Sequence, residues 1–251
     1  MLRHELLQGL HDLVQPRTYL EIGVQTGRSL RYSRACSIGG DPAFHLVNEV
    51  LCDLHLVRAT SDEFFARRHP LAHFPFPAAD LAFIDGMHLA EYALRDLINV
   101  EKYTLPTSVI VLDDMLPRHV DEAGRGREGA RVRGAWAGDV YKVVTTLREL
   151  RPDLVCLEVD TQPTGTVVIL LPDAGSTVLA SAYDQLVAEY VVPDPQQVPD
   201  EVIRRTRAIG AQELLDSPIW PQLRRLREQG HDSARSALRG ELDRAALLTP
   251  A

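Results

Sequence analysis

The chain has 251 residues, of which 45% are hydrophobic and 25% charged, and its formal net charge is −8 at pH 7. This composition is near the globular average and argues against wholesale disorder, a collagen-like chain and a disulfide scaffold. The acidic balance argues against nucleic acid or an anionic membrane as partner, because phosphate binding depends on clustered Lys and Arg. The longest apolar runs are far shorter than the ~20 residues of a membrane span. Three scattered cysteines indicate reduced thiols, so we expect a cytoplasmic protein with a small-molecule or protein partner.

Helical patterns and apolar strand-like segments alternate along the chain. The predicted helices are residues 2–14, 28–34, 62–68, 89–101 and 140–150. The predicted strands are residues 18–24, 36–42, 54–59, 81–85, 108–114, 155–159 and 166–171. The alternation up to residue 150 predicts a parallel, doubly wound sheet. The last two strands are joined by a short polar connection that contains Pro and Gly, which predicts a hairpin and therefore one late antiparallel strand.

We therefore expect an α/β fold with a doubly wound, mostly parallel sheet of seven strands. Residues 1–175 would form this domain, beginning with a helix inside residues 1–17, and residues 176–251 would form a helical C-terminal extension. Residues 117–136 carry five Arg and several Gly between two of the predicted elements. A long irregular segment of this kind predicts either a lid that orders over the substrate or a solvated charged loop.

Acidic residues stand at or just after the ends of the predicted strands. They are Glu21, Asp41, Asp62, Asp85, Asp113 and Asp114. A single Asp after a strand often only caps a helix, whereas several on one rim indicate a site, because ligands of doubly wound sheets bind beyond the carboxyl ends of the strands. Gly23 and Gly27 follow the first strand and would let the backbone approach a ligand closely. Asp41 lies 20 residues after Glu21, where a ribose diol would be held.

The segment Tyr-Leu-Glu-Ile-Gly-Val-Gln-Thr-Gly-Arg-Ser-Leu at residues 19–30 resembles motif I of class I S-adenosylmethionine (SAM)-dependent methyltransferases. Residues 37–42, 80–88 and 109–114 resemble the second, fourth and fifth strands of a metal-dependent subgroup that includes the macrocin-type sugar O-methyltransferases. The resemblance spans residues 18–172 and agrees with the late antiparallel strand. It implies a Rossmann-like methyltransferase fold, SAM as cofactor and a hydroxyl as methyl acceptor.

The resemblance also implies a cofactor role for individual positions. Glu21, Gly23 and Gly27 would line the methionine and ribose part of SAM, and Asp41 would accept hydrogen bonds from the ribose hydroxyls. Ser61 and Asp62 fall where the family contacts the adenine, and Asp85 is also expected to bind the cofactor.

Asp85, Asp113 and Asp114 match the metal ligands of metal-dependent O-methyltransferases, and His88 matches the catalytic base. Two carboxylates ~4 Å apart repel by about 4 kcal/mol at an effective dielectric near 20, so three on one rim must spread apart, take up protons or bind a cation. An all-oxygen site suits Mg²⁺ or Mn²⁺. The alternative is that Asp114 turns away, because neighbours on a strand point to opposite faces.

The expected function is Mg²⁺-assisted O-methylation of a small hydroxylated natural product or its sugar, with His88 as general base. Two alternatives remain open: a metal-independent methyltransferase of the same fold, and a non-catalytic binding or partner protein. The C-terminal pattern around Trp220, Leu223 and Leu226 predicts either a homo-oligomer contact or packing against the core.

Overall fold

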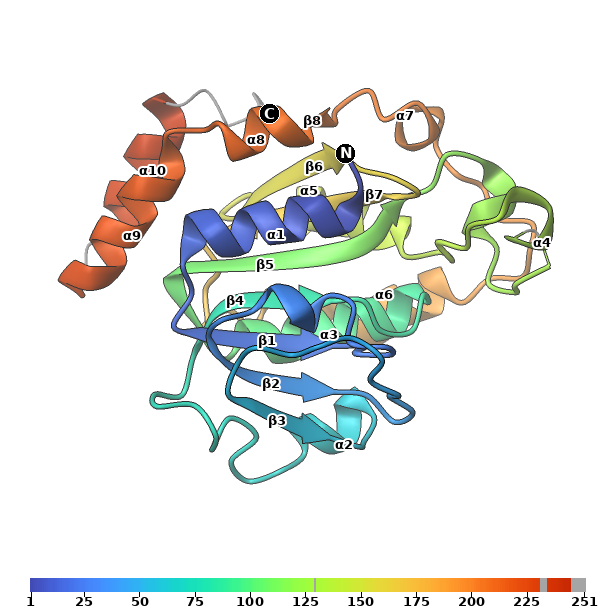
Figure 1. The fold of residues 1–251 in the computed structure, drawn as a ribbon. Coiled ribbons are helices and arrows are strands. Elements are labelled where there is room, and N and C mark those ends of the chain that lie inside the picture. The colour runs from blue at the N-terminus through green and yellow to red at the C-terminus, as the bar shows by residue number, and fades with distance from the viewer. Residues whose placement is uncertain (129, 231–233, 245–251) are drawn as a thin grey trace.

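The computed structural model describes residues 1–128, 130–230 and 234–244. Its centre is an eight-stranded sheet in the order β3-β2-β1-β4-β5-β7-β6-β8 (Figure 1). The strands are β1 Thr18–Ile22, β2 Cys36–Gly40, β3 Leu54–Val57, β4 Ala79–Ile84, β5 Thr104–Leu116, β6 Val155–Asp160, β7 Gly165–Leu170 and β8 Ile209–Gly210. Strand β7 is antiparallel to both β5 and β6, and the other pairs are parallel. The predicted α/β fold with a late antiparallel strand is confirmed.

Helices cover both faces of the sheet. The helices of the described residues are α1 Arg3–Val14, α2 Ser61–Phe65, α3 Ala90–Glu101, α4 Ala130–Arg133, α5 Tyr141–Leu150, α6 Val178–Tyr190, α7 Asp200–Ile203, α8 Ala211–Leu215, α9 Ile219–Gln229 and α10 Ala234–Arg244, with 3-10 turns η1 Leu30–Tyr32 and η2 Val120–Ala123. Helices α3, α5 and α6 pack in one apolar core, and α1, α9 and α10 pack in the other. Strand β1 is buried along its whole length, as a strand covered on both faces should be.

Two local predictions differ from the structure. The predicted helix at 28–34 is only the 3-10 turn η1, because the Ser29 hydroxyl donates to Glu21 and the Ser33 hydroxyl pairs with Ser37. Such side-chain bonds compete with a regular helix. The sheet has one strand more than the seven predicted, because two residues, Ile209 and Gly210, pair with the end of β6. A two-residue strand is too short to leave a pattern in the sequence.

Helices α6 and α9, which follow residue 176, pack against the rest of the chain. Leu179 and Leu186 of α6 belong to the same core as α3, and Trp220 and Leu223 of α9 are fully buried in the core that contains α1. Of the two alternatives predicted for the apolar residues of α9, a homo-oligomer contact or packing against the core, the structure shows packing against the core. Among the described residues, no helix is long and apolar enough to cross a membrane.

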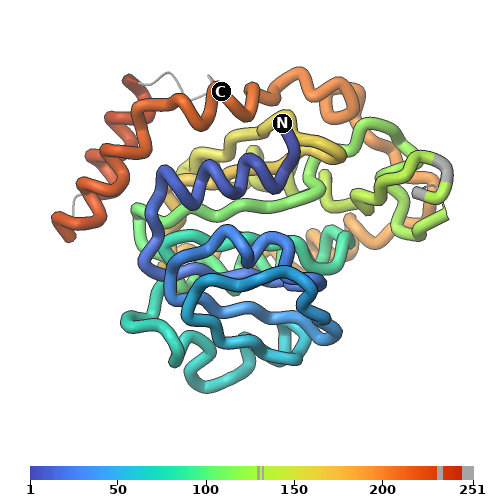
Figure 2. Tube along the Cα trace, in the orientation of Figure 1, coloured from blue at the N-terminus to red at the C-terminus, as the bar shows by residue number. Residues whose placement is uncertain are grey.

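The first residues of the chain lie beside the β6–β7 hairpin, as the tube in Figure 2 shows. Leu2 forms a bridge with Gln162, the Arg3 amide donates to the Gln162 carbonyl at 3.1 Å, and the Gln162 amide donates to the Met1 carbonyl at 3.0 Å. This pairing places the start of α1 near the carboxyl end of β5.

Candidate active site

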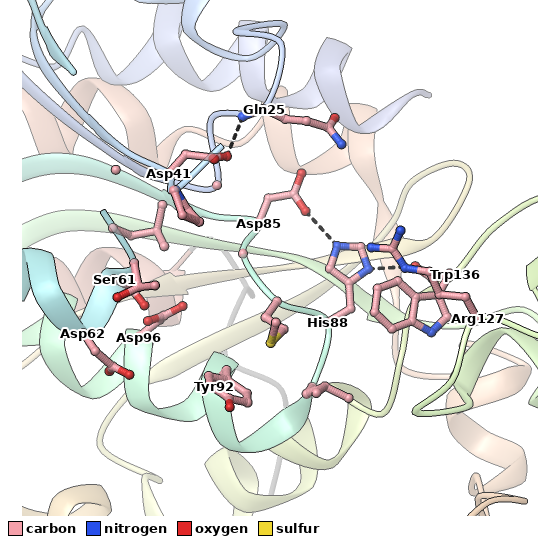
Figure 3. Close-up of a pocket in the computed structure, with 18 of the residues that line it drawn as sticks. Gln25, Asp41, Ser61, Asp62, Asp85, His88, Tyr92, Asp96, Arg127 and Trp136 are labelled. Atoms are coloured by element: carbon pink, nitrogen blue, oxygen red, sulfur yellow. Dashed lines mark hydrogen bonds and ion pairs between the residues drawn. The ribbon is translucent and has the colours of Figure 1, made fainter. Parts of the chain in front are cut away.

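A cavity of about 670 Å³ opens at the carboxyl ends of β1, β2 and β4 (Figure 3). Its volume is within the range of small-molecule sites. The predicted site residues that line it are Gly23, Asp41, Ser61, Asp62, Asp85 and His88. In Figure 3, Ser61, Asp62 and Asp96 lie on one side of Asp85, and His88, Trp136 and Arg127 lie on the other. The cavity therefore has two ends with different chemistry.

Gly23 lets the tips of β1 and β4 meet. Its φ is +91°, and a Cβ at this position would lie 1.9 Å from the carbonyl oxygen of Asp85. The Asp85 amide donates to the Ile22 carbonyl at 2.9 Å. A glycine is required for this approach, which places Asp85 against the first strand.

Glu21 and Gly27 are not among the residues that line the cavity. Glu21 is fully buried, and its carboxylate accepts from the hydroxyls of Tyr19 and Ser29, each at 2.6 Å. Burial raises the pKa of Glu21 to about 8. Gly27 has a φ of +72° and faces Leu46. Both residues therefore shape the turn behind the cavity, and their direct contact with a cofactor stays a prediction.

Asp41 is held by the backbone of two neighbouring turns. Its carboxylate accepts from the amide of Gln25 at 2.8 Å and from the amide of Ala43 at 2.6 Å. Each carboxylate oxygen keeps a second acceptor position. Asp41 is thus oriented with acceptor capacity left for a diol in the cavity.

The end of the cavity near α2 is polar. Ser61 begins α2, whose N-terminus is capped by Thr60. Asp62 pairs with Arg95 at 2.6 Å. Asp96 of α3 is only 2% exposed, its Oδ1 has no hydrogen-bond partner among the described residues, and burial raises its pKa to about 7. The sequence analysis missed Asp96, although an acidic residue on the apolar face of a predicted helix is an available signal.

Asp85, Asp113 and Asp114 come together at the tips of β4 and β5. Asp114 has a φ of +60°, a left-handed conformation that interrupts the alternation of the strand. Its carboxylate therefore lies on the same side as that of Asp113, and it accepts from the Thr164 hydroxyl. The alternative in which Asp114 turns away is not what the structure shows.

The guanidinium of Arg3 lies among these three carboxylates. Its nitrogens are 2.8 Å from Asp113, 3.3 Å from Asp114 and 3.8 Å from Asp85. Burial works against the charge, but the carboxylates outweigh it and raise the pKa of Arg3. The sequence analysis missed Arg3, because a single Arg in the first turn of a helix carries no signal for a site.

Asp85, His88 and Asp114 would suit a divalent cation by chemistry, since their donor atoms lie within 4.8 Å of one another. The arrangement around them does not fit one. Arg3 fills the space between the carboxylates, and its guanidinium supplies a positive charge there. The proposed mechanism therefore does not use the predicted Mg²⁺ or Mn²⁺.

His88 is fixed through both ring nitrogens. Nδ1 lies 2.8 Å from the carbonyl oxygen of Trp136, while Nε2 lies 3.2 Å from Asp85 and 3.1 Å from Asp114. The ring also stacks on the Trp136 indole, with centroids 4.8 Å apart. Burial opposes protonation, but the two carboxylates outweigh it and raise the pKa of His88 to about 9.

The segment 117–136 is anchored at several points. It contains η2 and α4, and Arg125 pairs with Glu91 at 2.6 Å and with Asp139 at 2.7 Å. The Arg127 guanidinium lies over the Trp136 ring, 4.5 Å from its centroid, and both residues line the cavity. Residues 125–127 and Trp136 form the wall of the cavity beside His88, and the movement of the segment as a lid stays a prediction.

Residues 20–115 match a family model described as a methyltransferase domain. This segment is therefore similar to a methyltransferase domain. The match covers β1 to β5 and includes the glycine turn, Asp41 and the acidic tips of β4 and β5, so the resemblance inferred from these motifs is confirmed. Among curated proteins, none matches the sequence.

Solved structures are similar in fold at low identity. Cofactor-bound Rv0187 from MTB is 16% identical, with 68% of this chain and 80% of that chain covered and a TM-score of 0.50. The O-methyltransferase TomG from Streptomyces achromogenes, involved in tomaymycin synthesis and solved with SAM, is 18% identical over 68% and 80%, with a TM-score of 0.46. MycE from the mycinamycin pathway, solved with Mg and SAH, is 17% identical over 67% and 49%, with a TM-score of 0.48. This likeness concerns the fold alone.

Proposed function

We propose that this methyltransferase transfers a methyl group from SAM to the hydroxyl of a small acceptor, such as a hydroxylated natural product or its sugar. The observation that carries the proposal is that one cavity joins Asp41, a fixed acceptor for a diol, to His88, a fixed imidazole. The distribution of polar groups supports SAM at the end near Asp41 and the acceptor at the end near Trp136.

Several features of the cavity suit SAM. Asp41 offers free acceptor positions to the ribose hydroxyls, and Ser61, Asp62 and Asp96 offer polar atoms around an adenine. Gly23 leaves room for the backbone to approach the ligand. The acidic rim also favours a sulfonium cation over an anionic ligand.

His88 would accept the proton of the acceptor hydroxyl. The oxygen attacks the methyl carbon, the new C–O bond forms as the C–S bond breaks, and S-adenosylhomocysteine leaves. Asp85 and Asp114 hold the ring and stabilise the imidazolium that results. Because the pKa of His88 is raised to about 9, the proton-accepting form is a minor species at neutral pH, and turnover should increase as pH approaches 9.

Most of the acceleration should come from holding the two reactants in line, since the methyl donor is already activated as a sulfonium. The stacked pair of His88 and Trp136 forms a flat wall, and Arg127 lies over the same indole. An acceptor on this wall would lie beside His88.

The test is methyl transfer from labelled SAM to a library of hydroxylated acceptors, with SAM binding measured by calorimetry. His88→Ala should lower turnover by roughly 10²- to 10⁴-fold, the usual contribution of a general base, and leave SAM affinity unchanged. His69→Ala, which removes an exposed histidine, is the matched control. Full turnover in His88→Ala would refute the base. Binding of SAM without transfer to any acceptor would favour the non-catalytic alternative.

A further inference from the structure

The geometry points to Arg3 as the resident cation of this site. Its guanidinium takes the position between Asp85, Asp113 and Asp114 that a divalent metal would need, so the folded protein binds no divalent metal there. This inference concerns the cation alone. It depends neither on the acceptor nor on methyl transfer.

The contacts of Arg3 are those of a shared counterion. One terminal nitrogen lies 2.8 Å from Asp113 and 3.3 Å from Asp114, and the other lies 3.8 Å from Asp85. Asp113 is fully buried and Asp114 nearly so, which makes their charges costly unless they are paired. A metal bound by the same oxygens would lie against the guanidinium and be repelled by it.

The backbone fixes Arg3 in this position. The backbone that leads into its Cα is tied to the β6–β7 hairpin, because the Arg3 amide donates to the Gln162 carbonyl and the Gln162 amide donates to the Met1 carbonyl. The same hairpin supplies Thr164, which donates to Asp114. The hairpin therefore aligns the cation and one of its carboxylates together, and the guanidinium is held by the fold of the chain.

The cluster already contains a permanent positive charge. The Arg3 guanidinium lies within 3.8 Å of Asp85, Asp113 and Asp114. Removing Arg3 leaves three carboxylates and an imidazole around the space vacated by its guanidinium. Carboxylate and imidazole donors are those that Mn²⁺ accepts.

Arg3 also lines the cavity, beside Asp85 and His88. In the proposed reaction, an N–H of its guanidinium would face the acceptor oxygen as negative charge develops on it. The charge stabilisation that a metal supplies in metal-dependent methyltransferases would here come from the protein itself.

The experiment measures Mn²⁺ binding to the ligand-free protein from the loss of the free-ion electron paramagnetic resonance signal. Wild type should leave the signal unchanged at equimolar protein. Arg3→Ala should bind one Mn²⁺ at least about tenfold more tightly than wild type, and Arg3→Ala combined with Asp114→Asn should lose that binding. Arg204→Ala, which breaks an exposed Arg–Asp pair, is the control and should behave as wild type.

Stoichiometric Mn²⁺ binding by wild type that Asp114→Asn abolishes would overturn the inference, and that measurement needs no variant of Arg3. Absence of binding in Arg3→Ala, with circular dichroism showing it folded, would also overturn it. If Arg3→Ala does not fold, Arg3→Gln is measured in its place. Binding of Mn²⁺ by Arg3→Gln would support the inference, and absence of binding in the folded variant would overturn it. A wild-type protein that binds SAM but transfers no methyl group would refute the proposed function and would not affect the conclusion drawn from Mn²⁺ binding.

Discussion

Replacing Gly23 by Ala tests whether the close approach of β1 and β4 builds the site. The new Cβ would lie 1.9 Å from the Asp85 carbonyl oxygen and 2.5 Å from its carbonyl carbon, so the backbone of one strand tip must move. The substitution also forces an L-residue into a φ of +91°. Gly134→Ala provides a matched control, because its φ is +79° and no atom lies within 4 Å of its Cβ position.

The two variants separate conformational strain from overlap. Left-handed backbone costs an L-residue about 1–2 kcal/mol, and both variants should lose that much stability. Overlap with fixed neighbours costs about 1–3 kcal/mol more, and only Gly23→Ala should lose it. The free energy of unfolding of Gly23→Ala should therefore be about 1–3 kcal/mol below that of Gly134→Ala.

Urea unfolding followed by circular dichroism gives both free energies, and calorimetry gives SAM affinity. Gly23→Ala should also bind SAM more weakly, because the shift displaces Asp85 in the cavity wall. Equal destabilisation of the two variants, with SAM affinity retained, would show that the strand tips do not need this approach and would refute the reasoning.

Two more predictions concern the turns around the cavity. Asp41→Ala should weaken SAM binding by about 1.5–3 kcal/mol, the usual worth of hydrogen bonds to a charged group, in a titration where the exposed control Asp184→Ala has no effect. The stability contributed by Glu21 should fall as pH rises from about 4.5 to about 8, because the folded state keeps a proton that the unfolded chain has lost. Glu21→Gln should therefore gain stability relative to wild type between pH 5 and pH 8 in urea unfolding, and a constant difference would contradict the raised pKa.

The order of elements was readable from the sequence because it depends on local patterns. Apolar segments alternating with helical stripes required a parallel sheet covered on both faces, and the Pro–Gly connection before the last long strand required a hairpin. Acidic residues at the ends of the predicted strands indicated that the site lies at the carboxyl edge of the sheet. Because parallel strands end at the same edge of a sheet, the sequence predicted that Asp41 and Asp85 lie close together.

Departures from the sequence-based picture arise where contacts between distant residues decide the outcome. Glu21 does not line the cavity, because the hydroxyls of Tyr19 and Ser29 donate to its carboxylate, and its contact with a cofactor stays a prediction. Asp114 was predicted to join Asp113, with the alternative that it turns away, and its left-handed backbone decides against that alternative.

Arg3 is the clearest case. It meets Asp114 across 111 positions of sequence, and only the pairing of the first residues with the β6–β7 hairpin brings it there. The sequence by itself predicted that three carboxylates share one rim, where they must spread apart, take up protons or bind a cation. The tertiary structure decided which cation lies among them, because a side chain that arrives from a separate helix leaves no periodic or spaced pattern in the residues around it.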